Sequence, residues 1–116
     1  MNKIIAVDFD GTLCENKWPD IGEPNYKVIE YVKYEKSQGT KIILWTCRTG
    51  SKLINAIKFC EENGIELDAV NENLPEMIEL FGEDTRKIFA DEYIEDKSVI
   101  PFGSPYRLAM IWMEEI

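Results

Sequence analysis

Two aspartates stand two positions apart, directly behind a short apolar run near the start of the chain. Asp8 and Asp10 follow Ile4–Val7 in the stretch IIAVDFDGT. Because side chains alternate in direction along an extended chain, we expect both carboxylates to point to the same side. Carboxylates this close repel each other unless a cation lies between them, and Mg²⁺ prefers such oxygen ligands. A carboxylate beside a metal can also attack phosphorus, so the pair indicates phosphoryl chemistry.

Other candidate residues also come directly after apolar runs. Thr46 ends the run IILWT, and Glu95 and Asp96 end the run YIED. Carboxyl ends of parallel strands meet at one edge of a sheet, where ligands bind in open α/β folds. We therefore predict that these three residues converge with Asp8. The simpler interpretation, in which the first acids only cap a turn at Gly11, requires no second acidic pair.

Composition limits the chemistry that these residues can do. The chain has 116 residues, of which 45% are hydrophobic, and we predict one domain over 1–116. It has no histidine, which excludes Ser-His-Asp and Cys-His catalysis and histidine-ligated zinc. Acidic residues number 22 against 13 basic ones, a net charge of −9, so a broad nucleic-acid-binding face is not expected.

The three cysteines indicate a reducing compartment. Cys14, Cys47 and Cys60 show no C-x-x-C spacing and are interpreted as free thiols of a cytoplasmic protein. The apolar run at the start is too short for a signal peptide or a membrane span, so no membrane partner is expected. Without a histidine partner, Cys14 and Cys47 are interpreted as small packing residues and not as nucleophiles.

The elements that must position these residues alternate between strand and helix. The expected strands are 3–8, 41–45, 67–70, a fourth ending near Glu95 and Asp96, and 98–102. The expected helices are 25–38, a segment capped at Ser51 and ending at Gly64, 74–81, and a last one opening at Ser104 and Pro105. Residues 11–24 are expected to form a loop. This order predicts a three-layer, Rossmann-like α/β fold, with a mostly parallel five-stranded sheet and helices on both faces.

The stretch DFDGT, residues 8–12, resembles the D-x-D-x-T signature of the haloacid dehalogenase superfamily of phosphohydrolases. IILWT, ending at Thr46, and YIED, ending at Asp96, are similar to two further elements of that family in the same order. The resemblance covers nearly the whole chain. It implies an Mg²⁺-dependent phosphomonoester hydrolase that works through an aspartyl-phosphate. Segments 11–24 and 71–87 are too short for the cap domain of many members, so we expect none.

The resemblance also implies roles for individual residues. Asp8 would be the nucleophile and Asp10 the general acid and base, with its backbone carbonyl a further metal ligand. Thr46 would hydrogen-bond a phosphoryl oxygen. The metal set would be Asp8, Asp10, Glu95 and Asp96. The acidic pair of the family is usually Asp-Asp, so the longer Glu95 leaves open whether it or Asp96 ligates directly.

A lysine upstream of the paired acids neutralises the phospho-aspartate in that family. Lys87 is the candidate here, although it lies closer to Glu95 than is usual, and Lys52 and Lys97 are alternatives.

The loops near the first two strand ends supply the candidate substrate-binding residues. These are Gly11, Thr12, Trp18, Cys47 and Arg48. The planar guanidinium of Arg48 suits a phosphate or carboxylate, and the alternative is a surface arginine at the start of a helix. Trp18 either covers the substrate or plugs the edge of the core.

We therefore expect a phosphatase acting on a small phosphorylated metabolite or nucleotide. The alternative substrate is a polynucleotide end, because the uncapped phosphatase domain of polynucleotide kinase-phosphatases is similar in places. A third possibility, from another class, is a non-enzymatic phospho-acceptor resembling a response-regulator receiver. That interpretation is disfavoured, because the receiver aspartate ends the third strand, which here ends near Val70 and Asn71. A binding module that has lost turnover is the fourth.

Overall fold

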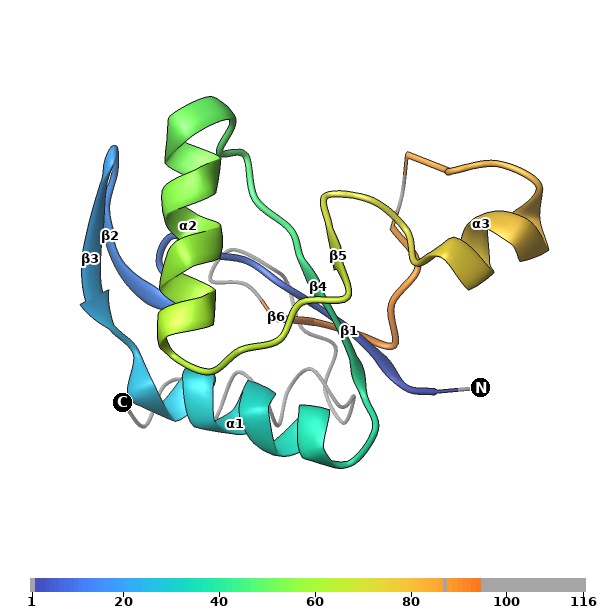
Figure 1. Cartoon of the computed structure of the whole chain (residues 1–116), viewed down its shortest axis with the longest axis horizontal. Helices are drawn as coiled ribbons and strands as arrows, with labels where there is room; N and C mark the ends of the chain where they lie inside the picture. Colours follow the sequence, from blue (N-terminus) through green and yellow to red (C-terminus); the bar gives the residue numbers. More distant parts are fainter. Residues whose placement is uncertain (1, 87, 95–116) are drawn as a thin grey trace, which may run out of the picture.

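The computed structural model describes residues 2–86 and 88–94 (Figure 1). Its elements in chain order are β1 (Ile4–Val7), β2 (Cys14–Lys17), β3 (Asp20–Pro24), α1 (Tyr26–Ser37), β4 (Lys41–Leu44), α2 (Gly50–Glu62), β5 (Ala69–Val70), α3 (Pro75–Phe81) and β6 (Glu92–Ile94). The predicted strand 98–102, the predicted last helix and the candidates Lys87, Glu95, Asp96 and Lys97 lie outside the described residues.

The main sheet has the strand order β5-β4-β1-β6, and all its described pairings are parallel. Val7 of β1 pairs with Leu44 on one side and with Ile94 on the other. At the opposite end of β1, Ile4 N donates to Asp91 Oδ2 and Asp91 N donates to Ile4 O, both at 2.7 Å. The prediction of a mixed α/β protein with a parallel sheet is therefore confirmed for these four strands, whereas the fifth strand stays a prediction.

Two buried clusters use alternate residues of β1, as the two-residue period of a strand requires. Ile5 and Val7 belong to a cluster with residues of α1 and α2, including Val32 and Cys60. Ile4 and Ala6 belong to the other cluster, which includes Met77 of α3. Figure 1 accordingly shows α3 set apart from α1 and α2 across the sheet. Buried side chains thus lie on both faces of β1, whereas the predicted three-layer arrangement stays a prediction.

The helices follow the predicted apolar spacing. Val28, Ile29 and Val32 of α1 are buried, as expected from their positions on one helical face. The predicted cap of α2 is wrong: Thr49 has the extended backbone of an N-cap, with φ −136° and ψ 167°, so the helix begins before Ser51. Within the described ranges, no helix is long and apolar enough to cross a membrane.

The predicted loop 11–24 is wrong over most of its length. Residues 14–24 form the antiparallel hairpin β2–β3, outside the main sheet and against α2 (Figure 1). The sequence conceals this hairpin because only Cys14 of β2 is buried, so no apolar alternation marks the strand. Gly22 makes the close pairing possible, since a Cβ at this position would lie 2.1 Å from Glu15 O.

Candidate functional site

The ends of β1, β4 and β6 lie side by side at one edge of the sheet. Asp8 N donates to Ile94 O at 2.9 Å, and Trp45 N donates to Val7 O at 2.9 Å. Asp8 therefore leaves the central strand with the ends of two neighbouring strands beside it. The predicted parallel arrangement of these strand ends is confirmed, whereas the convergence of Glu95 and Asp96 with Asp8 stays a prediction, because both acids lie outside the described residues. Glu95 directly follows Ile94 in the sequence, and its contribution to the site stays a prediction.

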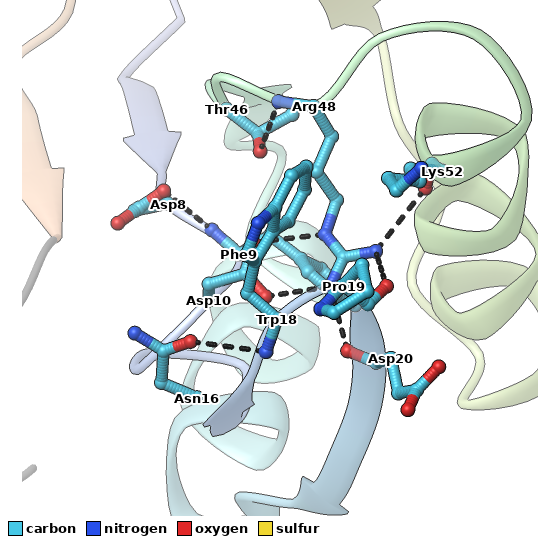
Figure 2. Close-up of polar contacts among 10 residues, drawn as sticks. All are labelled: Asp8, Phe9, Asp10, Asn16, Trp18, Pro19, Asp20, Thr46, Arg48 and Lys52. Atoms are coloured by element: carbon cyan, nitrogen blue, oxygen red, sulfur yellow. Dashed lines mark hydrogen bonds and ion pairs between the residues drawn. The ribbon is translucent and has the colours of Figure 1, made fainter.

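The chain turns sharply after Asp8. Leu13 N donates to Phe9 O at 3.0 Å, and Gly11 has φ 81°, a conformation that glycine adopts without strain. Asp8 Oδ1 accepts a hydrogen bond from Phe9 N at 2.8 Å, whereas the Asp10 carboxylate faces Arg48 (Figure 2). The prediction that both carboxylates point to the same side is wrong, because the backbone is not extended between them.

Arg48 binds the Asp10 carboxylate with two parallel hydrogen bonds. Its Nε donates to Oδ2 at 2.8 Å and its Nη2 donates to Oδ1 at 2.6 Å. The Arg48 side chain is 1% exposed and that of Asp10 is 19% exposed. This hydrogen bonding raises the pKa of the Arg48 guanidinium further above its ordinary value. The pair is a charge-assisted fork, the strong form of this contact.

The remaining Arg48 donors bind backbone carbonyls. Nη2 donates to Asp20 O at 2.8 Å, and Nη1 donates to Pro19 O at 3.3 Å and to Lys52 O at 3.4 Å. A guanidinium has five N–H donors, and these contacts occupy all of them. The alternative of a surface arginine is therefore wrong. Substrate binding by Arg48, which stays a prediction, would require one of these contacts to be exchanged.

Trp18 lies at the tip of the hairpin and covers the guanidinium. The Arg48 Cζ is 5.2 Å from the Trp18 ring centroid and 4.9 Å from that of Phe9. Lys52 Nζ is 5.7 Å from the same indole ring. Because Trp18 is 55% exposed, the alternative of a core plug is wrong, and substrate contact by its exposed surface stays a prediction.

Thr46 lies in the loop after β4, as predicted. Its Oγ1 accepts a hydrogen bond from Arg48 N at 3.2 Å, and its N donates to Asn71 Oδ1 at 2.7 Å. These contacts tie the loop after β4 to the end of β5. The predicted phosphoryl contact of Thr46 remains a prediction.

Thr12 and the three cysteines differ from one another in burial. Thr12 is fully buried, and its carbonyl accepts a hydrogen bond from Asn25 Nδ2 at 2.9 Å, so it holds the turn in this conformation. All three cysteines are free thiols, as predicted. Cys14 is buried, whereas Cys47 is exposed, so the packing interpretation is wrong for Cys47. Burial raises the pKa of Cys14 and, to about 12, that of Cys60.

Asn73 is a buried positioning residue that the sequence interpretation missed. It is 1% exposed, its Nδ2 donates to Asp84 Oδ1 at 2.9 Å and to Thr85 O at 3.1 Å, and its Oδ1 accepts from Phe89 N at 2.7 Å. It thus holds the backbone on both sides of residue 87. The only signal was an amide two positions before the proline that opens a helix.

The oxygen donors at this edge of the sheet are of the type that binds a hard cation, but the described residues supply too few of them for a complete ligand set. The described ranges contain no group of three His, Cys, Asp or Glu side chains able to hold a metal. Asp8 offers a carboxylate and Asp10 a backbone carbonyl, both oxygen donors of the type that Mg²⁺ prefers. The Asp10 carboxylate already binds Arg48. Completion of the ligand set would fall to Glu95 or Asp96.

No protein-family model and no curated protein matches the chain. A solved structure, described as a conserved protein from Bacteroides thetaiotaomicron, is similar, with a TM-score of 0.76 and 35% sequence identity. The match covers 99% of this chain and 92% of that one, so the chain belongs to the same family as this conserved bacterial protein. The similarity agrees with the α/β fold. Membership of the haloacid dehalogenase superfamily remains a prediction from the sequence motifs.

Proposed function

We propose that this protein is a phosphomonoester hydrolase in which Asp8 attacks phosphorus and Asp10 transfers the proton. One observation carries the proposal: Asp8 follows the central strand at the edge where the ends of β4 and β6 flank it. Open α/β sheets bind ligands at this edge. A turn-capping acid alone would require neither this convergence nor the acidic pair after Ile94.

The reaction proceeds in two displacements. An oxygen of the Asp8 carboxylate forms a bond to phosphorus, the bond from phosphorus to the leaving oxygen breaks, and Asp10 donates a proton to that oxygen. Water then attacks the phosphorus of phospho-Asp8, and Asp10 takes a proton from that water. The bond between phosphorus and Asp8 breaks, which releases inorganic phosphate and restores both carboxylates to their starting protonation states.

Mg²⁺ is the proposed cofactor, held by Asp8, Asp10 and the acids at 95 and 96. When bound, it supplies charge neutralisation between the carboxylate and the phosphate. Lys87 would add a positive charge beside phospho-Asp8.

The central test is Asp8→Asn, whose amide is nearly isosteric but is a poor nucleophile. Turnover of a panel of phosphorylated metabolites should fall by roughly a thousandfold or more, as for loss of other nucleophiles. Asp20→Asn is the matched control, because it changes an exposed side chain and keeps the carbonyl that Arg48 uses. Near-normal turnover in folded Asp8→Asn protein would overturn the mechanism.

A wild-type protein without turnover would favour a non-catalytic function instead. Acetyl phosphate and intact mass spectrometry would then distinguish the two remaining alternatives. A stable phosphoryl adduct, lost in Asp8→Asn, would indicate a phospho-acceptor. Phosphate binding without an adduct would indicate a binding module.

A small substrate is favoured over a polynucleotide end. The net charge is −9, and the charge of Arg48 at the site is already paired with Asp10. Each backbone phosphate held by a further cation would add salt dependence to binding. The measurement is the ratio of kcat/KM for a 3′-phosphorylated oligonucleotide and its mononucleotide at low and moderate salt. A preference of about tenfold for the oligonucleotide that vanishes as salt rises would favour the polynucleotide alternative.

A further inference from the structure

We propose that Arg48 is a positioning residue that holds the Asp10 carboxylate and the β2–β3 hairpin in one fixed arrangement, an inference that rests on the proposed function. Three segments meet at its guanidinium: the turn after β1, the hairpin and the first turn of α2 (Figure 2). The sequence placed Arg48 over the site as a substrate ligand. Its contacts are instead with other residues of the site, which it holds in place.

The fork fixes the rotation of the carboxylate. Two hydrogen bonds from Nε and Nη2 of Arg48, one to each Asp10 oxygen, define the plane of the carboxylate group. A single donor such as an ammonium would leave the group free to rotate about its terminal bond. An ionised carboxylate has about four lone-pair sites, of which the fork uses two. The others remain for a proton, so Asp10 can exchange one without leaving Arg48.

The same guanidinium fixes the hairpin. The carbonyls of Pro19 and Asp20, at the turn between β2 and β3, accept hydrogen bonds from Nη1 and Nη2. Phe9 and Trp18 contact the guanidinium with their rings, and their cover keeps its side chain 1% exposed. Cation–π contacts and hydrogen bonds are each stronger where water is excluded. Displacement of the hairpin would therefore release Asp10 as well.

Arg48→Lys separates a positioning residue from a substrate ligand, because it keeps the charge and loses the fork. Proton donation matters most for a poor leaving group, so kcat for an alkyl phosphate should fall by about a hundredfold. The kcat for p-nitrophenyl phosphate, a good leaving group, should fall by less than about tenfold. KM should stay within about twofold for both substrates. A rise in KM by one common factor, with kcat retained, would instead show direct phosphate binding and overturn the proposal.

Asp10→Asn provides the comparison within the proposed catalytic pair. It should show the same dependence on leaving group, and addition of Arg48→Lys should lower kcat no further, since both changes remove one function. If the two substitutions instead lowered kcat by independent factors that multiply in the double variant, the proposal would be contradicted. Glu23→Gln, an exposed change on β3, is the control and should leave both substrates unaffected.

Amide hydrogen exchange of residues 14–24 tests the coupling without any substrate. Arg48→Lys and Asp10→Asn should each speed exchange in this hairpin by about tenfold, and Glu23→Gln should not. Unchanged hairpin exchange in both variants would overturn the coupling, whatever the activity. An inactive wild type would instead overturn the proposed function, and with it the role of Arg48 in proton transfer. The two failures are thereby distinguishable.

Discussion

Two buried side chains each tie separate segments of the chain together, and they do so by different chemistry. Arg48 and Asn73 are each 1% exposed. Arg48 binds a carboxylate that is itself mostly buried, with 19% of the Asp10 side chain exposed. Asn73 is a neutral amide that binds backbone groups and the exposed Asp84.

The difference lies in what remains after either side chain is removed. Without Arg48, a charged carboxylate stays in a largely dry site, and the cost of an uncompensated charge is high. Without Asn73, water can reach Asp84, and the main loss is the partner of a backbone N–H. The two regions should therefore differ in how strongly they resist truncation.

The largest effect is expected for Arg48→Ala, which should lower the free energy of unfolding by roughly 3 kcal/mol. Urea denaturation measures this directly. Arg86→Ala, an exposed arginine in the described chain, is the control and should change stability by less than about 0.5 kcal/mol. The double variant Asp10→Asn, Arg48→Ala should recover part of the loss, since it removes the stranded charge. A loss as small as that of the control would show that the pair is not buried in solution.

Asn73→Ala should cost less, about 2 kcal/mol, because the groups left behind are neutral or can be hydrated. Asn55→Ala, at an exposed position of α2, is the matched control and should be neutral or slightly stabilising, since alanine favours helix. The same denaturation experiment applies. A loss greater than that of Arg48→Ala would break the comparison, because the neutral amide would then hold the more costly contacts.

Asp68 tests whether a charged contact that is only partly buried contributes as much to stability as the buried contact of Arg48. Burial opposes its ionisation, but hydrogen bonds from Lys36 Nζ and Ile42 N outweigh this and lower the pKa of Asp68. Because its pKa is lower in the folded state, ionised Asp68 stabilises the folded protein, and this contribution is complete at pH values above the unfolded pKa, about 3.9. That stability is lost as the pH falls through the folded pKa.

Asp68→Asn should therefore cost about 1 kcal/mol or less at pH 7, as partly exposed pairs do. The difference from wild type should shrink in urea unfolding below about pH 4. A difference that stays constant down to pH 2 would show that the carboxylate charge contributes nothing.

The rates of thiol labelling should show the smallest and most local difference between the Arg48 and Asn73 variants. Cys47 is exposed and should react with a disulfide reagent at once, whereas buried Cys14 and Cys60 should be protected. Arg48→Lys should speed labelling of Cys14, which begins β2, by about tenfold without affecting Cys60 in α2. Asn73→Ala should speed neither. Equal acceleration of both thiols would indicate global loosening and not release of the hairpin.

The sequence was informative where a periodic pattern met a strand end. Apolar runs before Asp8 and Thr46 predicted parallel strands of one sheet, and the structure pairs these two strands in parallel. The buried face of α1 followed from the spacing of Val28, Ile29 and Val32. Such features depend on local spacing and on the rules of parallel sheets, so one sequence is sufficient to predict them.

The sequence was uninformative where a single side chain decides the arrangement. Nothing in the spacing of Arg48 indicates that it turns inward to Asp10, a residue 38 positions away. The hairpin escaped prediction because its strands pair with each other and bury little apolar surface. Asn73 was not predicted, because a single buried amide produces no periodic pattern in the sequence. These contacts arise from tertiary packing and are not encoded in any short window.

The position of β1 between β4 and β6 also bears on synthesis of the chain. Asp8 is translated well before Glu92–Ile94, so one edge of its strand stays open until those residues have been made. Ribosomes add about 5–20 residues per second, so this apolar edge is unpaired for several seconds in each nascent chain. An open strand edge invites association with other chains. The strand that carries Asp8 therefore acquires its second neighbour, β6, late in synthesis, and until then its open edge is exposed to other chains.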